Sequence, residues 1–246
     1  IGGATAAAAI VAPTRVTQAL SVTVPEGADD LGLDADALSE LGSYYAQAAS
    51  TANPSAIYDE LLSVRPYAGH RLDRAVRPIR RRTDLNVATG YLSSVLAVVT
   101  SYMNDHAAAL VWCADAERRS RESDHPELAG WAMLTRATVS YYQGQAARSA
   151  DLASQGQTLC RPGTVAHAKL AAQEMRARAM LGDPRGMEDA KRRATFAIAQ
   201  LPSSVPNSGI FSITFDEDPP YTATSLLLVQ RYEQAVTATA RVIQRT

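Results

Sequence analysis

The residues that could carry out chemistry are spread along the chain without the spacing that catalysis requires. The sequence contains no phosphate-binding glycine loop and no His-Glu-x-x-His, Gly-x-Ser-x-Gly or Cys-x-x-Cys motif. Glu174 has no partner at a defined spacing, so it does not indicate acid–base catalysis. We therefore expect a protein that is not an enzyme and that has no metal site and no cofactor. The four histidines fall in separate parts of the chain: His70, His106, His125 and His167.

Seven arginines are concentrated in one part of the chain and could form a binding surface. They could hold an anion, a nucleic-acid phosphate or an acidic partner. The alternative is a solvated helix end, where basic side chains oppose the negative end of the helix dipole, and this alternative is favoured. The arginines are Arg65, Arg71, Arg74, Arg77, Arg80, Arg81 and Arg82, of which Arg71–Arg82 form the dense part.

Charge and cysteine content limit the partners and the compartment. A net charge of -1 gives no electrostatic footprint for nucleic acid, so we expect this chain alone to bind DNA weakly or not at all. Cys113 and Cys160 are too few for a disulfide framework. They could bridge neighbouring repeats, but two reduced, packed thiols are favoured, and with them a reducing compartment, the cytoplasm.

The N-terminal segment is apolar but short. An apolar run of about 12 residues cannot span a bilayer, so we expect no membrane association. Residues 1–33 are predicted to be a linker or an N-terminal docking segment, with part of an export signal as the alternative. The start at Ile1 suggests a fragment of a longer chain. Residues 34–246 are predicted to form one helical-repeat domain.

The elements that must position any site are alanine-rich helical hairpins. Their turns fall at Asn104-Asp105, Gly144-Gln145, Gly182-Asp183 and Gln230-Arg231, at steps of 40, 38 and 48 residues. This period is near that of helical-hairpin solenoids, with one insertion before the last unit. We therefore predict an all-α, tetratricopeptide-like solenoid that winds as a right-handed superhelix. Five residues after the first member of each turn, a small or flexible side chain allows two helices to pack: Ala109, Ser149, Met187 or Ala235.

Capping residues predict where individual helices begin. Asn53 followed by Pro54 opens one helix, and Thr83 or Asp84 opens another. Asp124 is predicted to cap the helix that follows Pro126. Further helices are expected at about 34–49, 105–120, 127–143, 145–160, 164–181, 184–201, 221–230 and 232–244.

The longest break in the predicted repeats is the loop 202–218. It carries Ile210, Phe211 and Phe215, apolar residues that an exposed loop would not retain without something to pack on. We expect it to lie over the mouth of the concave face as a lid that responds to ligand. The equal alternative is a plug that fills the end of the solenoid.

Several short stretches occur in a characteristic order and spacing: Tyr91–Ala97, Asp124–Ala132, Ser140–Gly144, Leu170–Arg176 and Gly209–Ser212. Through them, the segment Leu92–Arg245 resembles the C-terminal tetratricopeptide-like region of actinobacterial helix-turn-helix transcription regulators of the XRE type. The resemblance implies a sensor or oligomerisation module whose DNA-binding domain is absent from this chain, so that DNA would be contacted only through that domain.

Two functions follow from these observations. The first is a ligand-sensing or protein-interaction module that binds a small molecule or a peptide effector on the concave face, in a regulator expected to be a homodimer. The second is a structural scaffold for homodimerisation or docking without a small-molecule ligand. The candidate ligand-binding residues combine aromatic area with hydrogen-bonding groups: Asn86, Tyr91, Trp131, Thr135, Tyr142, Gln173, Arg176, Phe211 and Tyr221.

An ordinary packing role is the alternative for each of these candidates, and it is favoured for Trp131 and Tyr142. Large aromatic side chains at helical spacing usually pack in a core. Gln173 and Arg176 are the better candidates for a functional pair, because polar groups that face a groove require a partner.

Overall fold

The computed structural model describes residues 35–74, 79–206, 208–214 and 218–244, with the side chains of residues 70, 71, 73, 74 and 79–81 excluded. The predicted segment 1–33, Phe215 and most of the arginine stretch Arg71–Arg82 lie outside this description. The described residues form ten helices and no strands, as the all-α prediction requires. The helices are α2 (Ala35–Ala48), α3 (Pro54–Arg74), α4 (Ile79–Tyr102), α5 (His106–Ser123), α6 (Pro126–Tyr142), α7 (Ala146–Leu159), α8 (Val165–Met180), α9 (Pro184–Ala199), α10 (Thr222–Leu228) and α11 (Tyr232–Ile243).

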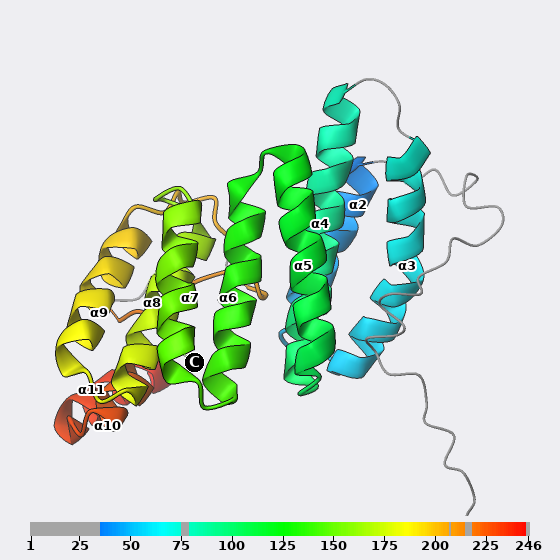
Figure 1. Cartoon of the computed structure of the whole chain (residues 1–246). Coiled ribbons are helices and arrows are strands. Elements are labelled where there is room, and N and C mark those ends of the chain that lie inside the picture. Colours follow the sequence, from blue (N-terminus) through cyan, green and yellow to red (C-terminus); the bar gives the residue numbers. More distant parts are fainter. Residues whose placement is uncertain (1–34, 75–78, 207, 215–217, 245–246) are drawn as a thin grey trace, which may run out of the picture.

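The helices pack as hairpins that follow one another along the molecule (Figure 1). Helices α4 and α5, α6 and α7, α8 and α9, and α10 and α11 form the pairs. The even-numbered helices also contact one another in order, from α2 through α4, α6 and α8 to α10. We call the surface formed by these five helices the even-helix face. None of the described helices is both long and apolar enough to cross a membrane.

The four predicted turns share one backbone geometry. The first residue of each has a left-handed conformation, with φ of 60° at Asn104, 75° at Gly144, 69° at Gly182 and 61° at Gln230. The next amide donates a hydrogen bond of 2.9–3.0 Å to the carbonyl five residues earlier, which satisfies the end of the first helix. The predicted turn positions are therefore confirmed. The small or flexible residues that follow each turn are all buried: Ala109, Ser149, Met187 and Ala235.

Two predicted helix starts were wrong. Helix α4 already includes Ile79, so Thr83 and Asp84 lie inside it. Arginine has a high helix propensity, so the arginine-rich run before Thr83 is itself helical. Asp124 does not cap α6. It ends α5 in the left-handed conformation, with φ of 51°, and His125 takes the N-cap position without a side-chain bond. A short aspartate tolerates this conformation better than most residues, so it stops the first helix instead of starting the second.

One arginine of the predicted basic stretch serves the core. Arg65 is buried on α3, and its Nη2 lies 2.5 Å from Asp115 Oδ2 on α5. Ser93 of α4 donates to the same carboxylate oxygen at 2.6 Å. Burial alone would raise the pKa of Asp115, but Arg65, Ser93 and Arg119 together hold it well below its usual range. This network ties three successive helices together, which is a structural role.

The two cysteines are free and buried, which agrees with the prediction of packed thiols and not with a bridge between repeats. Burial raises the pKa of each thiol to about 12, because a thiolate would lose its hydration there. Cys160 also marks a point of close helix approach. A Cβ added at Gly130 of α6 would lie 1.9 Å from Cys160 Sγ, so only glycine fits at this position.

Gly130→Ala should lower the free energy of unfolding by about 3 kcal/mol, because the new methyl group overpacks this contact. Gly42→Ala is the matched control, since a Cβ there would meet nothing closer than 3.9 Å and alanine is the better helix former. Chemical denaturation measures both. Adding Cys160→Ala to Gly130→Ala should recover most of the loss, and a double variant as unstable as the single one would contradict this account.

Candidate functional site

The chain between α9 and α10 crosses the even-helix face (orange in Figure 1). The Ile210 amide donates to the Ala46 carbonyl of α2 at 2.9 Å, and Lys169 Nζ of α8 donates to the Ile210 carbonyl at 2.8 Å. Gly209 has φ of 95°, and a Cβ there would lie 2.8 Å from the Ala46 carbonyl oxygen. We call residues 209–213 the crossing segment. These contacts place it across the even-helix face, between α2 and α8.

The Phe211 side chain divides this face into two pockets. Its ring lies 5.3 Å from the Tyr91 ring and 4.8 Å from the Trp131 ring, measured between centroids. Trp131 and Phe211 line both pockets, so a single aromatic pair forms the wall between them. Ile210 and Ile213, which flank Phe211, are buried against the helices.

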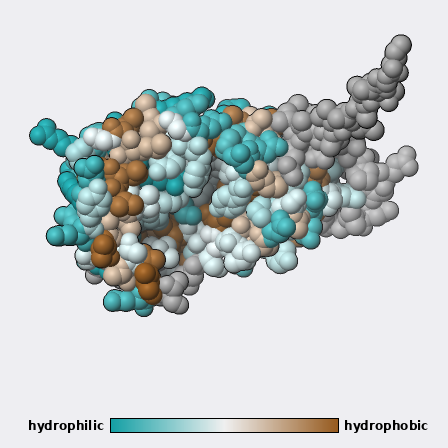
Figure 2. All heavy atoms as spheres, turned by 90° about the horizontal axis from the view of Figure 1, so that it is seen from below, coloured by the Kyte–Doolittle hydropathy of each residue, from teal (hydrophilic) through white to brown (hydrophobic). Residues whose placement is uncertain are grey.

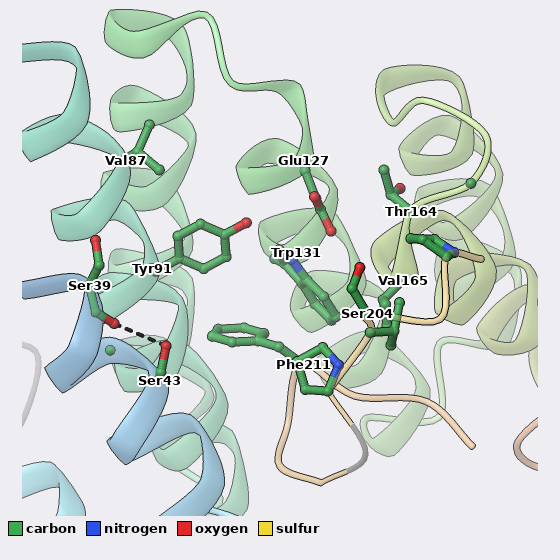
Figure 3. A pocket seen from close by; sticks show the side chains of 15 residues that line it. Ser39, Ser43, Val87, Tyr91, Glu127, Trp131, Thr164, Val165, Ser204 and Phe211 are labelled. Atoms are coloured by element: carbon green, nitrogen blue, oxygen red, sulfur yellow. Dashed lines mark hydrogen bonds between the residues drawn. The ribbon is translucent and has the colours of Figure 1, made fainter. Parts of the chain in front are cut away.

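The larger cavity, which we call the Glu127 pocket, has a volume of about 420 Å³ and is lined by α2, α4, α6 and the loops at 163–165 and 202–206 (Figure 3). Trp131 Nε1 is buried and faces the Tyr91 hydroxyl and the Glu127 carboxyl without a well-formed hydrogen bond to either. Burial raises the pKa of Glu127, although His125 opposes the shift. Burial, followed by the nearby Glu127, raises the pKa of Tyr91. The pocket therefore places a buried indole N–H beside an acid.

The smaller cavity, which we call the Arg176 pocket, has a volume of about 200 Å³. It lies between α4, α6, α8, the crossing segment and the start of α10. Its lining includes four hydroxyl side chains, Ser94, Ser101, Thr135 and Thr138, and no carboxylate. Six of the nine predicted binding residues come together here: Trp131, Thr135, Tyr142, Arg176, Phe211 and Tyr221.

Arg176 is held by aromatic rings. Its guanidinium carbon lies 4.1 Å from the ring centroid of Tyr221, 4.3 Å from that of Tyr141 and 5.4 Å from that of Tyr142. Its Nε donates to Gln173 Oε1 at 2.7 Å. The side chain is 5% exposed, and no carboxylate of the described residues pairs with it. Cation–π contacts stabilise the buried charge but provide no acceptor for the remaining N–H groups.

The other three predicted residues lie elsewhere. Tyr91 lines the Glu127 pocket. Gln173 is fully buried between α6, α7 and α8, where its Nε2 donates to Ser149 Oγ at 2.9 Å, so it positions Arg176 instead of facing a ligand. Asn86 is buried beside α5, where its Oδ1 accepts from Arg119 Nη1 at 3.1 Å. Both pack between helices and line neither pocket.

Lys169 is the important residue of the site that the sequence reading missed. It lines the Arg176 pocket, and its Nζ lies 5.7 Å from the Trp131 ring centroid. Tyr91, Trp131 and Lys169 each stand thirteen residues before the left-handed residue of their turn, so equivalent positions on α4, α6 and α8 hold the crossing segment. That shared register is the signal that could have found Lys169. Within the described residues, no group of histidine, cysteine and acidic side chains could hold a metal ion.

No protein-family model, curated protein or solved structure matches this chain. The chemistry of the two pockets is therefore the guide to its function.

The buried Lys169 amine should make stability depend on pH. Burial lowers its pKa from 10.5 to about 8, so the unfolded chain binds more protons between these values and the free energy of unfolding rises with pH across them. Between about pH 7 and about pH 10, the free energy of unfolding of the wild type should rise by about 2 kcal/mol relative to that of Lys169→Met. Urea unfolding at each pH measures this difference. A difference that does not change with pH would contradict the burial of a charged amine here.

Phe211→Ala tests whether the crossing segment is a plug or a lid. Its ring packs on Tyr91 and Trp131, so we expect its removal to cost about 2 kcal/mol, less than a fully buried phenylalanine costs. Phe196→Ala is the control, since that ring is 66% exposed and should matter little. Thermal unfolding measures the loss of stability in both variants. If Phe211→Ala destabilises the protein as little as Phe196→Ala does, the segment is a lid.

Proposed function

We propose that this chain is a binding module whose even-helix face is the concave surface of a tetratricopeptide-like solenoid and takes up a small molecule or a peptide. The ordered contacts between the even-numbered helices support this architecture. The common geometry of the four turns supports it as well, because equal turns place successive hairpins in similar orientations.

The observation that carries the proposal is the pair of pockets on either side of Trp131 and Phe211. Pockets for small ligands combine apolar and aromatic walls with a few polar groups that lack a protein partner. Both features are present: aromatic rings form the shared wall, Trp131 Nε1 on one side makes no well-formed hydrogen bond, and the Arg176 guanidinium on the other retains unused donors. A buried donor without an acceptor is costly, and a ligand removes that cost.

We further propose that the module belongs to a transcription regulator and reports its occupancy to a DNA-binding domain. This part rests on the resemblance of Leu92–Arg245 to the actinobacterial regulators. A reducing cytoplasm and a homodimer are the setting that this proposal implies. Two states of the crossing segment, with and without ligand, would provide the coupling that such a sensor requires.

A docking scaffold is the second candidate, and an exposed apolar patch favours it. Apolar side chains gather at the end of the molecule formed by α9, α10 and α11 (Figure 2). Tyr232, Val236 and Ile243 lie along one side of α11, while Ala235 and Ala238 on another side are buried. A second copy of the chain would present the same surface, as a two-fold dimer requires. The exposed members are Phe196, Leu227, Leu228, Tyr232, Val236, Val242 and Ile243.

The indole of Trp131 provides the test, because its ring lines both pockets. In a Trp112→Phe background, Trp131 is the one remaining tryptophan, and its emission should change saturably with members of a mixed library of neutral, acidic and basic aromatic fragments. In the reciprocal control, Trp131→Phe, the emission of Trp112 in the core should not respond. If no fragment changes Trp131 emission and the chain self-associates in sedimentation experiments, the scaffold replaces the binding module.

A further inference from the structure

We infer that the Arg176 pocket binds the carboxylate group of an organic acid, with the guanidinium of Arg176 as the direct contact. This inference rests on the proposed binding function and names the chemical class of the ligand. It is independent of which larger molecule carries the carboxylate, since a small acid and the C-terminus of a short peptide offer the same group.

The first argument is the state of the buried cation. The two other buried arginines of the described residues have carboxylate partners: Arg65 pairs with Asp115, and Arg119 lies 3.1 Å from Glu122. Arg176 is as buried as these two, yet within the described residues its only hydrogen bond is the one from Nε to Gln173. Its Nη1 and Nη2 groups therefore have no acceptor among the described residues. A planar guanidinium with two free NH2 groups matches the two oxygens of a carboxylate.

The second argument is the absence of acids from the walls. Among their described residues, α4, α6, α8 and α10 carry three carboxylates, Asp84, Glu127 and Glu174. Asp84 is exposed, Glu127 lines the other pocket, and Glu174 pairs with Arg193 and Arg178. None of the three lines the Arg176 pocket. The pocket thus keeps its positive charge uncompensated by the described protein.

Lys169 adds a second cation to the same pocket. It is seven residues before Arg176 on α8, which places it about 10 Å away along the helix axis on the same side. One carboxylate therefore contacts Arg176, while Lys169 contributes to the positive potential and has donors beyond its bond to Ile210.

Three hydroxyl groups of the walls have no proton to donate to a ligand. Ser94, Ser101 and Thr135 donate to carbonyls of their own helices, Gly90, Val98 and Trp131. Each hydroxyl has one proton, so these three can only accept from a ligand, and a carboxylate takes its charged donors from Arg176 and Lys169.

The remaining walls describe the body of the ligand. Val98, Leu134, Tyr102 and Tyr142 provide apolar and aromatic area. The volume of about 200 Å³ is below the range for drug-sized ligands, which start at about 300 Å³, so it suits a small aryl acid or the last residue of a peptide.

The experiment compares charged and neutral forms of one ligand. Phenylpropionate and phenylpropionamide have nearly the same shape, and an apolar tripeptide with a free or an amidated C-terminus supplies the second pair. Calorimetry on the whole chain should show that at least one free acid binds about tenfold or more tightly than its amide, a difference of about 1.4 kcal/mol. The pair that responds tells whether a small acid or a peptide end is the better ligand.

Variants then locate the contact. Arg176→Gln should abolish the preference for the acid, whereas Arg178→Gln, two residues along α8 and paired with Glu174, should retain it. Thermal unfolding of each variant checks that it folds, and the acid–amide comparison in the wild type needs no variant. Equal binding of acid and amide, no binding of either acid, or a preference that survives Arg176→Gln would each overturn the inference. Neutral or basic fragments that still bind next to Trp131 would leave the proposed binding function standing.

Discussion

Close approach of helices is the constraint on which this structure depends. Alanine-rich helices have shallow faces, and they bury enough surface only if their backbones come near one another. Gly130 beside Cys160 and Gly90 beside Leu128 are the tightest points between helices, because a Cβ added at either would overlap a neighbouring side chain. Tyr58 and Trp112 pack within this helical core. Trp131 and Phe211 instead lie at the even-helix face, where they form the aromatic wall between the two pockets.

The treatment of buried charge separates scaffold from site. Where the chain only needs to hold helices together, as at Arg65 and Asp115, the ion pair is complete and further hydrogen bonds saturate it. On the even-helix face, Arg176 is buried and Lys169 partly buried, and neither has a carboxylate partner among the described residues. An unpaired buried cation destabilises a protein, so its presence indicates a requirement other than stability. The described part of the chain therefore pairs a buried arginine with a carboxylate in the helix core and leaves one without a carboxylate at the pocket.

The sequence predicted the scaffold better than the site, for a physical reason. Turn positions follow from local backbone preferences, and the left-handed residues at Asn104, Gly144, Gly182 and Gln230 are where the spacing placed them. Helix starts are harder to predict, since a residue such as Asp124 can cap either the end of one helix or the beginning of the next. Which side of a helix faces the pocket depends on how neighbours pack. Asn86 and Gln173 are therefore buried between helices, although their residue types suit a ligand. Lys169 was not predicted, because a single lysine forms no recognisable sequence pattern.

The crossing segment changes how such an array unfolds. In a simple row of hairpins each unit touches its neighbours, so the ends can fray and units can open one at a time. Here the amide of Ile210 is bonded to α2, and the same residue's carbonyl is bonded to α8. This clasp joins parts of the chain that are far apart in the sequence, and its formation must wait until most of the array has assembled. The hairpins should consequently lose their structure together, as one cooperative unit, and fold more slowly than their local contacts would suggest.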